Sequence, residues 1–516
     1  MSDAAAPDHA EPDHAAMDHA ACYAAFKAHD PRFDGRLFVA VSSTGIYCRP
    51  VCRVKMPKAE NCTFHVSAAS AEQAGFRPCL KCRPELAPGN APVDAAADLA
   101  RGAAMAMEED NLSETGLAEL ARRMGITDRH LRRTFAAEYG VSPVQYLQTR
   151  RLLLAKSLLA DTRLPVTEIA FAAGFGSIRR FNDLFRKHYR LSPGDVRRQA
   201  AFKEKDEKEG ITVKLGYRPP LAWNRLLAFL ASRAVPGVES VADGGYRRTV
   251  ALPNGDTLCR GWIAVTGPAR ANTVAVTLSP ALLPVLSKVL ARVRHLFDLN
   301  CHPAEVAERL ASMDIVVAGA HGPGIFEPGT RLPGCFDPFE MAVRAVLGQQ
   351  ITVKAARTLA MRLTAAFGRA LETPFPELTH TFPSAETIAG LEQPIGDRLG
   401  PLGITGARAR SIFALANALA SGDIVLSQRA DPRETMQKLL ALPGFGPWTV
   451  EYVAMRALAW PDAFPHTDLG VKKALAGLSP DAILNAAEQW RPWRSYATIA
   501  LWDSLAAPPL SERSTS

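Results

Sequence analysis

The segments ThrGlyIleTyrCysArgProValCys (44–52) and GlyPheArgProCysLeuLysCysArg (75–83) decide the fold of the N-terminal part of this chain. They supply four cysteines, as a C-x3-C pair and a C-x2-C pair on two short loops: Cys48, Cys52, Cys79 and Cys82. This spacing fits a tetrahedral Zn²⁺ site with four thiolate ligands. A zinc-bound thiolate is also a nucleophile, so the site is either an inert structural element or a reactive centre.

The composition of the chain excludes several classes of protein. At 516 residues the chain is too long for one core, so we expect roughly three or four domains. A net charge of +8 favours a polyanionic partner. No apolar run approaches the roughly 20 residues that span a bilayer, and the N-terminus lacks a basic segment followed by an apolar one. We therefore expect a cytoplasmic protein without membrane contact. The remaining cysteines are scattered singly, which suits a reducing compartment: Cys22, Cys62, Cys259, Cys301 and Cys335.

Two arginine-rich helical units follow the cysteines. Residues 116–135 have the helix, glycine turn and capped second helix typical of a helix-turn-helix, and residues 166–189 repeat the pattern. Each second helix carries basic side chains that suit a DNA major groove: Arg129, Arg132 and Arg133, then Arg179, Arg180 and Arg186. The alternative is a solvated basic face on a helical bundle, and the duplication weakens it. The stretch resembles the AraC-type DNA-binding domain, which implies two linked units on successive major-groove turns.

The region around the cysteines has a resemblance of its own. Residues 33–52 and the later GlyPheArgProCysLeuLysCysArgPro (75–84) closely resemble the N-terminal domain of the Ada methylation-response family. The resemblance implies that Cys48 takes a methyl group from a methyl phosphotriester in DNA and keeps it, while Cys52, Cys79 and Cys82 complete the zinc site. Nearby basic residues suit a phosphate backbone: Arg49, Arg53, Lys55, Arg77, Lys81 and Arg83.

Methylation of Cys48 would also change the charge of the site. A zinc ion with four thiolates carries a formal charge of −2, and one methylated sulfur brings it to −1, which lessens repulsion of DNA. We therefore expect methylation to strengthen operator binding. Cys62 lies off the ligand spacing, and we expect it to be a buried small hydrophobe rather than a ligand.

The C-terminal half contains LeuProGlyPheGlyProTrpThr (442–449). Its glycines Gly444 and Gly446 lie between helical patterns, and Pro447 suits a first helical position, so backbone N–H groups can face a phosphate. This resembles a helix-hairpin-helix motif. Asp468, which alone would be interpreted as a helix N-cap, completes the pattern of the DNA glycosylase superfamily.

Further segments narrow the resemblance to the AlkA-type 3-methyladenine glycosylases over nearly all of residues 211–506: 223–239, 294–299, 345–351 and 490–497. The resemblance implies a base pocket of Trp448, Tyr452, Trp502 and Gln349, and DNA contacts by Gly444, Gly446, Thr449 and Gln350. Gln350 stands where an apolar wedge is expected, and Leu347 or neighbouring residues are further candidates to share that role. Trp448 stands where bifunctional relatives have a lysine, which argues against a lyase step.

The chemistry of that site follows from the residue types. An alkylated purine is already cationic, so its glycosidic bond breaks toward an oxocarbenium ion with little need for a general acid. A carboxylate such as Asp468 stabilises that cation and orients water. Stacking a cationic base on aromatic rings contributes on the order of 1–2 kcal/mol more than stacking a neutral one.

We expect a multidomain, mainly α protein with α+β parts. From the N-terminus we expect a disordered acidic tail (1–20), a four-cysteine zinc domain (21–90), a double helix-turn-helix domain (91–200), a charged linker (201–210), an α/β N-terminal glycosylase subdomain (211–300), an all-α helix-hairpin-helix glycosylase domain (301–508) and a tail (509–516).

The sequence thus predicts a fusion of an alkylation sensor and transcriptional activator with an alkylbase DNA glycosylase. The expected cofactor is Zn²⁺, and the expected partners are alkylated double-stranded DNA, a promoter operator and RNA polymerase. We expect a monomer associated with the nucleoid. One alternative is a regulator with structural zinc and an inactive glycosylase-like half, against which Asp468 and the pocket aromatics argue. Another is a repair enzyme that uses the helical units for nonspecific DNA attachment, against which the duplication argues.

Overall fold

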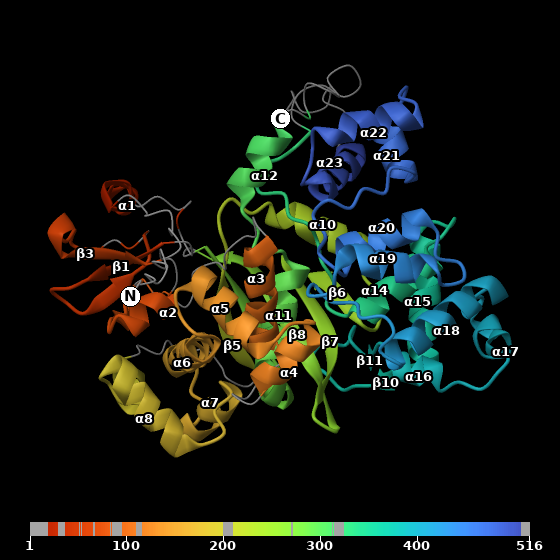
Figure 1. Cartoon of the computed structure of the whole chain (residues 1–516). Helices are drawn as coiled ribbons and strands as arrows, with labels where there is room; N and C mark the ends of the chain where they lie inside the picture. Colours follow the sequence, from red (N-terminus) through yellow and green to blue (C-terminus); the bar gives the residue numbers. More distant parts are fainter. Residues whose placement is uncertain are drawn as a thin grey trace, which may run out of the picture.

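The computed structural model describes residues 19–28, 33, 37–50, 52, 54–65, 68–82, 84, 95–109, 116–199, 210–269, 272–311, 313 and 325–506. Residues 1–18 of the expected tail, residues 201–209 of the expected linker and the expected tail 509–516 lie outside the described residues. The chain runs from a small N-terminal sheet, through a group of helices and a larger sheet, to a second large group of helices (Figure 1). The expected fold class is confirmed.

The N-terminal domain is a four-stranded sheet in the order β3-β1-β2-β4, in which only β2 and β4 are parallel. Gly45 has a φ of +65° in the turn between β1 and β2, a backbone conformation that favours glycine. The elements are α1 (His19–Lys27), β1 (Phe38–Val41), β2 (Ile46–Cys48), the 3₁₀ helix η2 (Ala59–Asn61), β3 (Cys62–His65), α2 (Ala68–Gln73) and β4 (Arg77–Pro78).

The prediction of a disordered tail over residues 1–20 is wrong for residues 19 and 20, because α1 begins at His19. The imidazole Nε2 of His19 lies 3.0 Å from the carbonyl oxygen of Cys62, so a tertiary contact holds this end of the helix. The acidic composition of residues 1–18 led the sequence analysis to place the end of the tail two residues inside α1.

The next domain contains the two predicted helix-turn-helix units. Thr127 and Ser177 cap the second helix of each unit by accepting hydrogen bonds from the backbone N–H groups of His130 and Arg180. The helices are α3 (Ala95–Glu109), α4 (Gly116–Arg123), α5 (Asp128–Tyr139), α6 (Pro143–Asp161), α7 (Val166–Ala172), α8 (Ile178–Tyr189) and α9 (Pro193–Gln199). The units are α4–α5 and α7–α8, joined by α6.

An antiparallel five-stranded sheet in the order β5-β9-β8-β7-β6 follows. Alternating burial along β5 and β9 matches a sheet with one face on the core. The elements are β5 (Ile211–Gly216), α10 (Trp223–Arg233), β6 (Glu239–Ala242), β7 (Gly245–Asn254), β8 (Thr257–Ala269), β9 (Thr273–Leu278), the 3₁₀ helix η5 (Pro280–Val285), α11 (Leu286–Leu296) and α12 (Pro303–Leu310).

The C-terminal part is helical apart from a two-residue pairing of β10 (Arg369–Ala370) with β11 (His380–Thr381). Its helices are α14 (Pro338–Leu347), α15 (Val353–Phe367), α16 (Ala385–Ala389), α17 (Ile395–Leu399), η6 (Gly400–Leu402), α18 (Gly406–Ala420), α19 (Pro432–Leu440), α20 (Pro447–Arg456), α21 (Leu469–Ala474), α22 (Pro480–Glu488) and α23 (Arg494–Ala506).

The apolar cores show how the parts are joined. One continuous buried cluster includes Ile169 and Phe181 of the second helix-turn-helix unit together with the sheet and the C-terminal helices. The first unit has a separate cluster around Leu120 and Phe135. Helix α3 contacts α11, α6 contacts β5, and α7 contacts η5. The helix-turn-helix domain is therefore packed against the larger sheet and the helices that follow it. Within the described ranges, no helix combines the length and apolarity that crossing a membrane requires.

Candidate metal centre, nucleic-acid interface and active site

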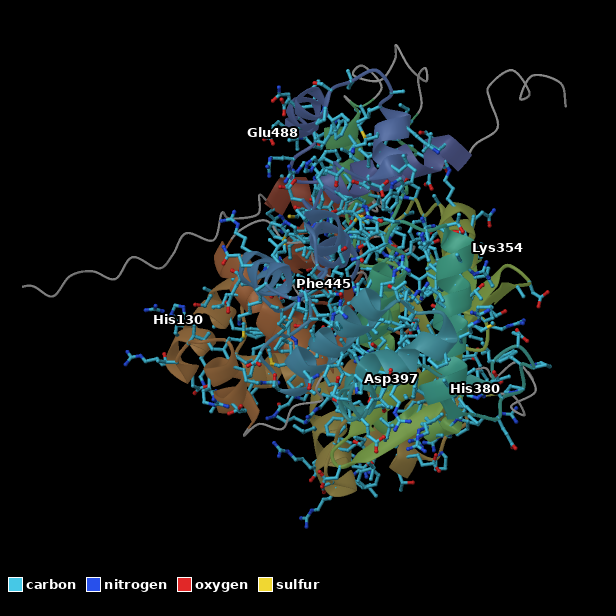
Figure 2. All side chains as sticks on the ribbon, turned by 90° about the vertical axis from the view of Figure 1, so that its right-hand side faces the viewer. His130, Lys354, His380, Asp397, Phe445 and Glu488 are labelled. Carbon is cyan, nitrogen blue, oxygen red and sulfur yellow. The ribbon has the colours of Figure 1, made fainter. Side chains whose placement is uncertain are left out.

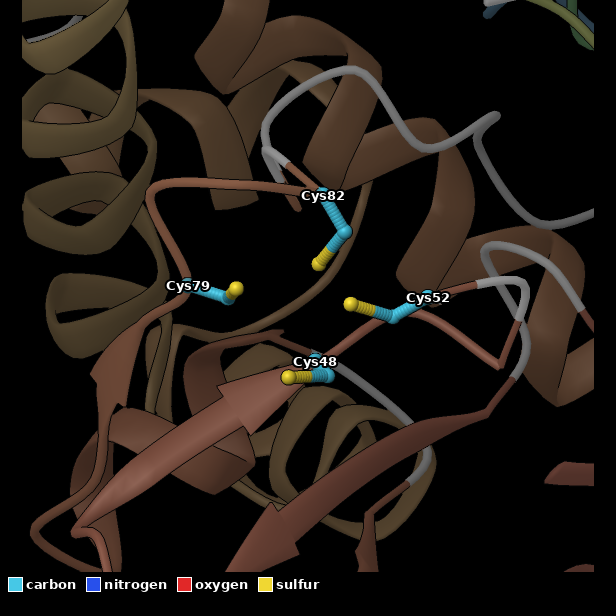
Figure 3. Close-up of side chains that lie close together, drawn as sticks. All are labelled: Cys48, Cys52, Cys79 and Cys82. Atoms are coloured by element: carbon cyan, nitrogen blue, oxygen red, sulfur yellow. The ribbon is translucent and has the colours of Figure 1, made fainter. Parts of the chain in front are cut away.

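The four predicted ligand cysteines come together. Their sulfur atoms all lie within 4.8 Å of one another, and Figure 3 shows them gathered around a common space. Cys48, Cys52 and Cys79 are buried, while Cys82 is partly exposed. The sequence analysis placed both cysteine pairs on loops. In the structure, Cys48 is the last residue of β2, and Cys79 directly follows β4. The parallel pairing of β2 with β4 explains why ligands 31 positions apart in the chain meet.

The donor set of this cluster fits zinc. Hydrogen bonding among the sulfurs, chiefly to Cys52, raises the pKa of the Cys48 thiol, whereas hydrogen bonding to Cys48 lowers the pKa of Cys79. The sulfurs thus compete for the same protons, and a divalent cation satisfies all four because it binds each as a thiolate. Four buried or half-buried sulfurs at this spacing match a zinc site with four thiolate ligands.

The surroundings of the cluster differ in part from the expectation. Arg49 is buried, with 4% of its surface exposed, so its side chain does not face a DNA backbone. Lys55 and Lys81 are exposed and Arg77 is half-buried, while Arg53 and Arg83 lie outside the described residues. Cys62 is buried and lies outside the cluster, and its Sγ donates to the carbonyl oxygen of Lys58 over 3.4 Å, as expected for a non-ligand.

The predicted DNA-reading arginines are all exposed on the second helices of their units. Arg129, Arg132 and Arg133 lie on α5, and Arg179, Arg180 and Arg186 lie on α8. Arg132 makes a 2.7 Å ion pair with Asp128, so its charge is partly neutralised. Figure 2 shows His130 of α5 at the outer edge of the molecule, and Phe445 of the C-terminal hairpin nearer its centre.

The hairpin at residues 441–446 joins α19 to α20. Gly444 has a φ of +77°, and a Cβ there would collide with the side chain of Ser411, so the turn requires glycine. Gly446 is the N-cap of α20, and Pro447 follows it at the first helical position, as expected. Thr449 is buried, so its side chain is not exposed to DNA, and its predicted DNA contact stays a prediction.

Gln349 is tied to this hairpin. Its Nε2 donates hydrogen bonds to the carbonyl oxygen of Gly444 over 2.8 Å and to the hydroxyl of Thr449 over 2.9 Å. Its place in the base pocket stays a prediction. Gln350 is exposed in the turn after α14 with a φ of +55°, so wedging by this residue also stays a prediction. Leu347 is completely buried, so the prediction that it shares the wedge role is wrong.

Four N–H groups converge on the side chain of Asp468, the N-cap of α21. Oδ1 accepts hydrogen bonds from the backbone of Gly470 over 2.7 Å and of Val471 over 3.1 Å. The indole Nε1 of Trp448 donates to Oδ2 over 2.8 Å, and that of Trp502 donates to Oδ1 over 2.8 Å. The N-cap interpretation and the catalytic one are therefore compatible: the cap holds the carboxylate in place.

The predicted pocket aromatics lie together, and two of them contact this carboxylate. The rings of Trp448 and Tyr452 are nearly parallel, 5.4 Å apart at 7°, and Tyr452 lies 6.1 Å from Trp502. The structure adds Phe229 of α10, which stacks on Trp502 at 6.3 Å and 17°. Sequence reasoning missed Phe229 because an apolar residue on an amphipathic helix is ordinarily a core residue.

Two arginines lie behind these rings. The guanidinium carbon of Arg233 lies 3.8 Å from the centroid of Phe229, and that of Arg456 lies 4.9 Å from it. Nη1 of Arg456 donates to the hydroxyl of Tyr452 over 2.9 Å. Burial raises the pKa of Tyr452, but the charges of Arg456 and Arg233 outweigh it and lower the pKa overall. No sequence signal indicated this pair.

Four family models match consecutive parts of the chain. They are the metal binding domain of Ada (residues 21–85), a helix-turn-helix domain (120–199), the AlkA N-terminal domain (212–337) and the HhH-GPD superfamily base excision DNA repair protein (343–482). Each predicted resemblance is therefore confirmed at the level of the family, and zinc is the cofactor that the first of these domains implies.

Relatives match both the whole chain and its halves. A probable bifunctional transcriptional activator/DNA repair enzyme AlkA of Mycobacterium tuberculosis is 40% identical over 94% of this chain and 96% of its own length. The chain belongs to this bifunctional AlkA family. DNA-3-methyladenine glycosylase 2 of Escherichia coli is 37% identical over 56% of this chain and 95% of its own length. The bifunctional activator/repair enzyme Ada of the same organism is 35% identical over 29% of this chain and 40% of its own length.

Proteins of the bifunctional AlkA family have two functions in one chain. The protein is a transcriptional regulator and a base excision DNA repair enzyme that binds DNA through both halves. The expected fusion is confirmed.

Proposed function

We propose that this chain senses methylated DNA backbones, activates transcription when methylated, and excises alkylated bases such as 3-methyladenine. The glycosylase part rests chiefly on one observation, the hydrogen bonds that hold Asp468 between Trp448 and Trp502. The rival functions, a regulator with an inactive half and a repair enzyme without regulation, each leave one of the two sites of this chain unused.

Base excision follows from the residues around Asp468. The flipped, cationic base stacks among the aromatic rings, whose faces are electron-rich. As the glycosidic bond breaks, both bonding electrons leave with the base, and positive charge develops on the sugar. The carboxylate of Asp468 lies beside the pocket and stabilises that charge. It then orients a water molecule, which adds to the sugar cation, loses one proton to solvent and leaves an abasic site. No lysine stands at Trp448 to form a Schiff base.

Methyl transfer is assigned to Cys48. Its sulfur attacks the methyl carbon of a phosphotriester, so that a C–S bond forms while the C–O bond breaks. The electron pair of that bond stays on the phosphate oxygen, and a normal phosphodiester anion is restored. Bound zinc keeps the four sulfurs as thiolates and so supplies the nucleophile. Cys48 becomes a thioether, and the step is not reversed.

The regulatory step uses the helix-turn-helix units. Loss of one negative charge at the zinc site lessens the repulsion of the DNA backbone, so the methylated chain binds its operator more tightly and recruits RNA polymerase. The exposed arginines of α5 and α8 supply the groove and phosphate contacts. We propose that the chain acts as a monomer at the nucleoid.

The glycosylase proposal is tested with methylated duplex DNA and the full chain. Chromatography measures the free 3-methyladenine that is released. Release is expected for the wild type and not for Asp468→Asn. Equal release by both proteins would remove Asp468 from the mechanism, and no release by either would favour the inactive-half alternative.

A further inference from the structure

A cavity of about 100 Å³ lies between the helix-turn-helix domain and the glycosylase half. Its walls come from α3 and α6 on one side and from β5 and α11 on the other. Since roughly 10–15 Å³ of such volume holds one water, the cavity accommodates a group of several heavy atoms. Its lining includes no residue of α5, α8 or the base pocket, so neither site described above uses it.

Cationic side chains dominate the polar lining of this cavity: Arg150, Arg151, Lys214 and Arg294. Two of them have carboxylate partners. Nη2 of Arg150 lies 3.0 Å from Oε1 of Glu108, and Nζ of Lys214 lies 3.6 Å from Oδ1 of Asp161. The same Oε1 of Glu108 also accepts a hydrogen bond from the hydroxyl of Tyr146 over 3.0 Å.

Arg294 differs from its neighbours. Among the residues that the structure describes, none makes a hydrogen bond or ion pair with its guanidinium group. Burial and the nearby charge of Arg150 lower the pKa of Arg294 to about 10, so it remains a cation at neutral pH. The carboxylate of Glu108 offsets only part of the cost of burying this charge, because it is already paired with Arg150, and an anion in the cavity offsets more of it.

We propose that this cavity binds a small phosphate-bearing molecule, with the phosphate on Arg294 and Arg150. Guanidinium groups bind phosphate oxygens in a bidentate manner, and the apolar walls formed by Leu147, Leu215 and Leu290 suit an organic body attached to the phosphate. The ligand is a free small molecule rather than an operator phosphate, because the cavity lies off the recognition helices. Since both halves line the cavity, the bound ligand stabilises their contact.

The test is calorimetric titration of the full chain with AMP and, separately, with inorganic phosphate. We expect one saturable site, binding at least tenfold weaker in Arg294→Gln, and unchanged binding in Arg260→Gln, which changes an exposed arginine of β8 outside the cavity. Base excision is expected to persist in Arg294→Gln, which shows that the variant is folded. Absence of saturable binding, or equal binding by Arg294→Gln, overturns the proposal. Competition by duplex DNA would assign the site to backbone phosphates and overturn the small-ligand proposal.

A second, independent observation concerns the contact between the zinc domain and α8. The hydroxyl of Tyr47, which precedes Cys48 in β2, donates a hydrogen bond to Oε1 of Glu72 over 2.7 Å, and both side chains are buried. Oε2 of the same carboxylate lies 4.0 Å from Nδ1 of His188 in α8. Strand β4, which leads into Cys79, also packs against α8. The second recognition helix therefore lies against the zinc domain at two places: Glu72, which is bonded to the neighbour of Cys48, and β4, which leads into Cys79.

Resting on the proposed methyl transfer, we infer that Glu72 is a positioning residue that couples the state of Cys48 to α8. A methyl group on Cys48 displaces the end of β2, Tyr47 moves with that strand, and Glu72 transmits the change to His188. The position of α8 in the major groove then differs between the unmethylated and methylated chains. This route acts in addition to the change in electrostatic repulsion.

The coupling is tested with a duplex that the methylated full chain selects from a random-sequence pool. Methyl uptake, zinc content and the ratio of operator affinities before and after methylation are measured for the wild type, Glu72→Gln and the exposed control Glu60→Gln. Glu72→Gln is expected to keep methyl uptake and zinc but to reduce the ratio severalfold, whereas Glu60→Gln keeps it. An unchanged ratio in Glu72→Gln overturns the coupling alone. A ratio of one in the wild type overturns the proposed switch itself.

Discussion

The indole Nε1 of Trp448 donates a hydrogen bond to Oδ2 of Asp468 over 2.8 Å, although the two residues are 20 positions apart. The same indole stacks on Tyr452. One tryptophan therefore contacts both the aromatic rings and the carboxylate. In the proposed mechanism, recognition of the base and stabilisation of the sugar cation then depend on the same side chain.

Replacing Asp468 by asparagine should abolish most base excision. The amide keeps the shape of the side chain but cannot stabilise a developing cation by charge, so single-turnover excision from methylated duplex DNA is expected to fall by about 100-fold or more. Duplex affinity should stay close to that of the wild type. The control is Asp481→Asn, an exposed aspartate in the first turn of α22. A loss of excision shared by both variants would contradict the assignment.

Phenylalanine at Trp502 retains an aromatic surface but cannot donate to Asp468. A hydrogen bond to a charged group contributes about 1.5–3 kcal/mol, which corresponds to a decrease in kcat of roughly 10- to 100-fold, with a smaller change in KM. The control is Trp493→Phe, which changes a tryptophan that packs edge-to-face against Tyr496. An effect of Trp502→Phe confined to KM would indicate that this indole contributes only stacking.

Zinc content should distinguish Cys52 from Cys62, although both are buried. Cys52→Ala removes one of four sulfurs that lie within 4.8 Å of one another and is expected to lose its zinc. Cys62→Ala removes a sulfur outside this cluster and is expected to retain one zinc per chain. Metal analysis of the purified proteins measures the difference. Equal zinc in both variants would contradict the ligand set.

Removing an arginine from a recognition helix should weaken DNA binding in a salt-dependent way. Arg180→Ala is expected to reduce the slope of log affinity against log salt by about 0.9 if it contacts a phosphate. A larger loss for operator than for unrelated DNA would indicate a base contact instead. Arg260→Ala is the control, and unchanged binding in Arg180→Ala would remove α8 from the interface.

The stability of the glycosylase half should depend on the ionisation of Asp503. Burial raises the pKa of this carboxyl to about 6, despite Arg225 nearby. The unfolded chain releases this proton at a lower pH, near about 4. Between these values the folded state binds more protons, so stability falls as pH rises from about 4 to 6, by at most about 3 kcal/mol.

Asp503→Asn removes this dependence. The melting temperature of the variant, relative to that of the wild type, should therefore increase between pH 4.5 and pH 7, as differential scanning fluorimetry can measure. A difference that is the same at both pH values would contradict the raised pKa.

The sequence was sufficient where chemistry depends on local spacing. The cysteine pairs, the capped second helices and the GlyPheGlyPro turn each impose a local backbone geometry that these residues alone determine. For that reason the sequence alone could place Asp468 at a helix N-terminus, where it is the N-cap of α21.

Contacts that depend on packing between distant elements were not predictable. Phe229 comes from α10, more than 200 residues before Trp448, and its apolar side chain is indistinguishable from a core residue. The burial of Leu347 depends on neighbouring helices rather than on its own segment, so the sequence could not exclude this residue as a wedge. The charged composition of residues 203–208 likewise gave no indication that the helix-turn-helix domain packs on the sheet.

We propose that one chain carries two chemistries on two residues, Cys48 and Asp468. This proposal is tested most directly by incubating the full chain with DNA that carries radiolabelled methyl groups on both phosphates and bases, and then measuring label on protein and as free base. We expect both products for the wild type, only free base for Cys48→Ala, and only labelled protein for Asp468→Asn. A variant that loses both products, or a variant that retains both, would contradict this proposal.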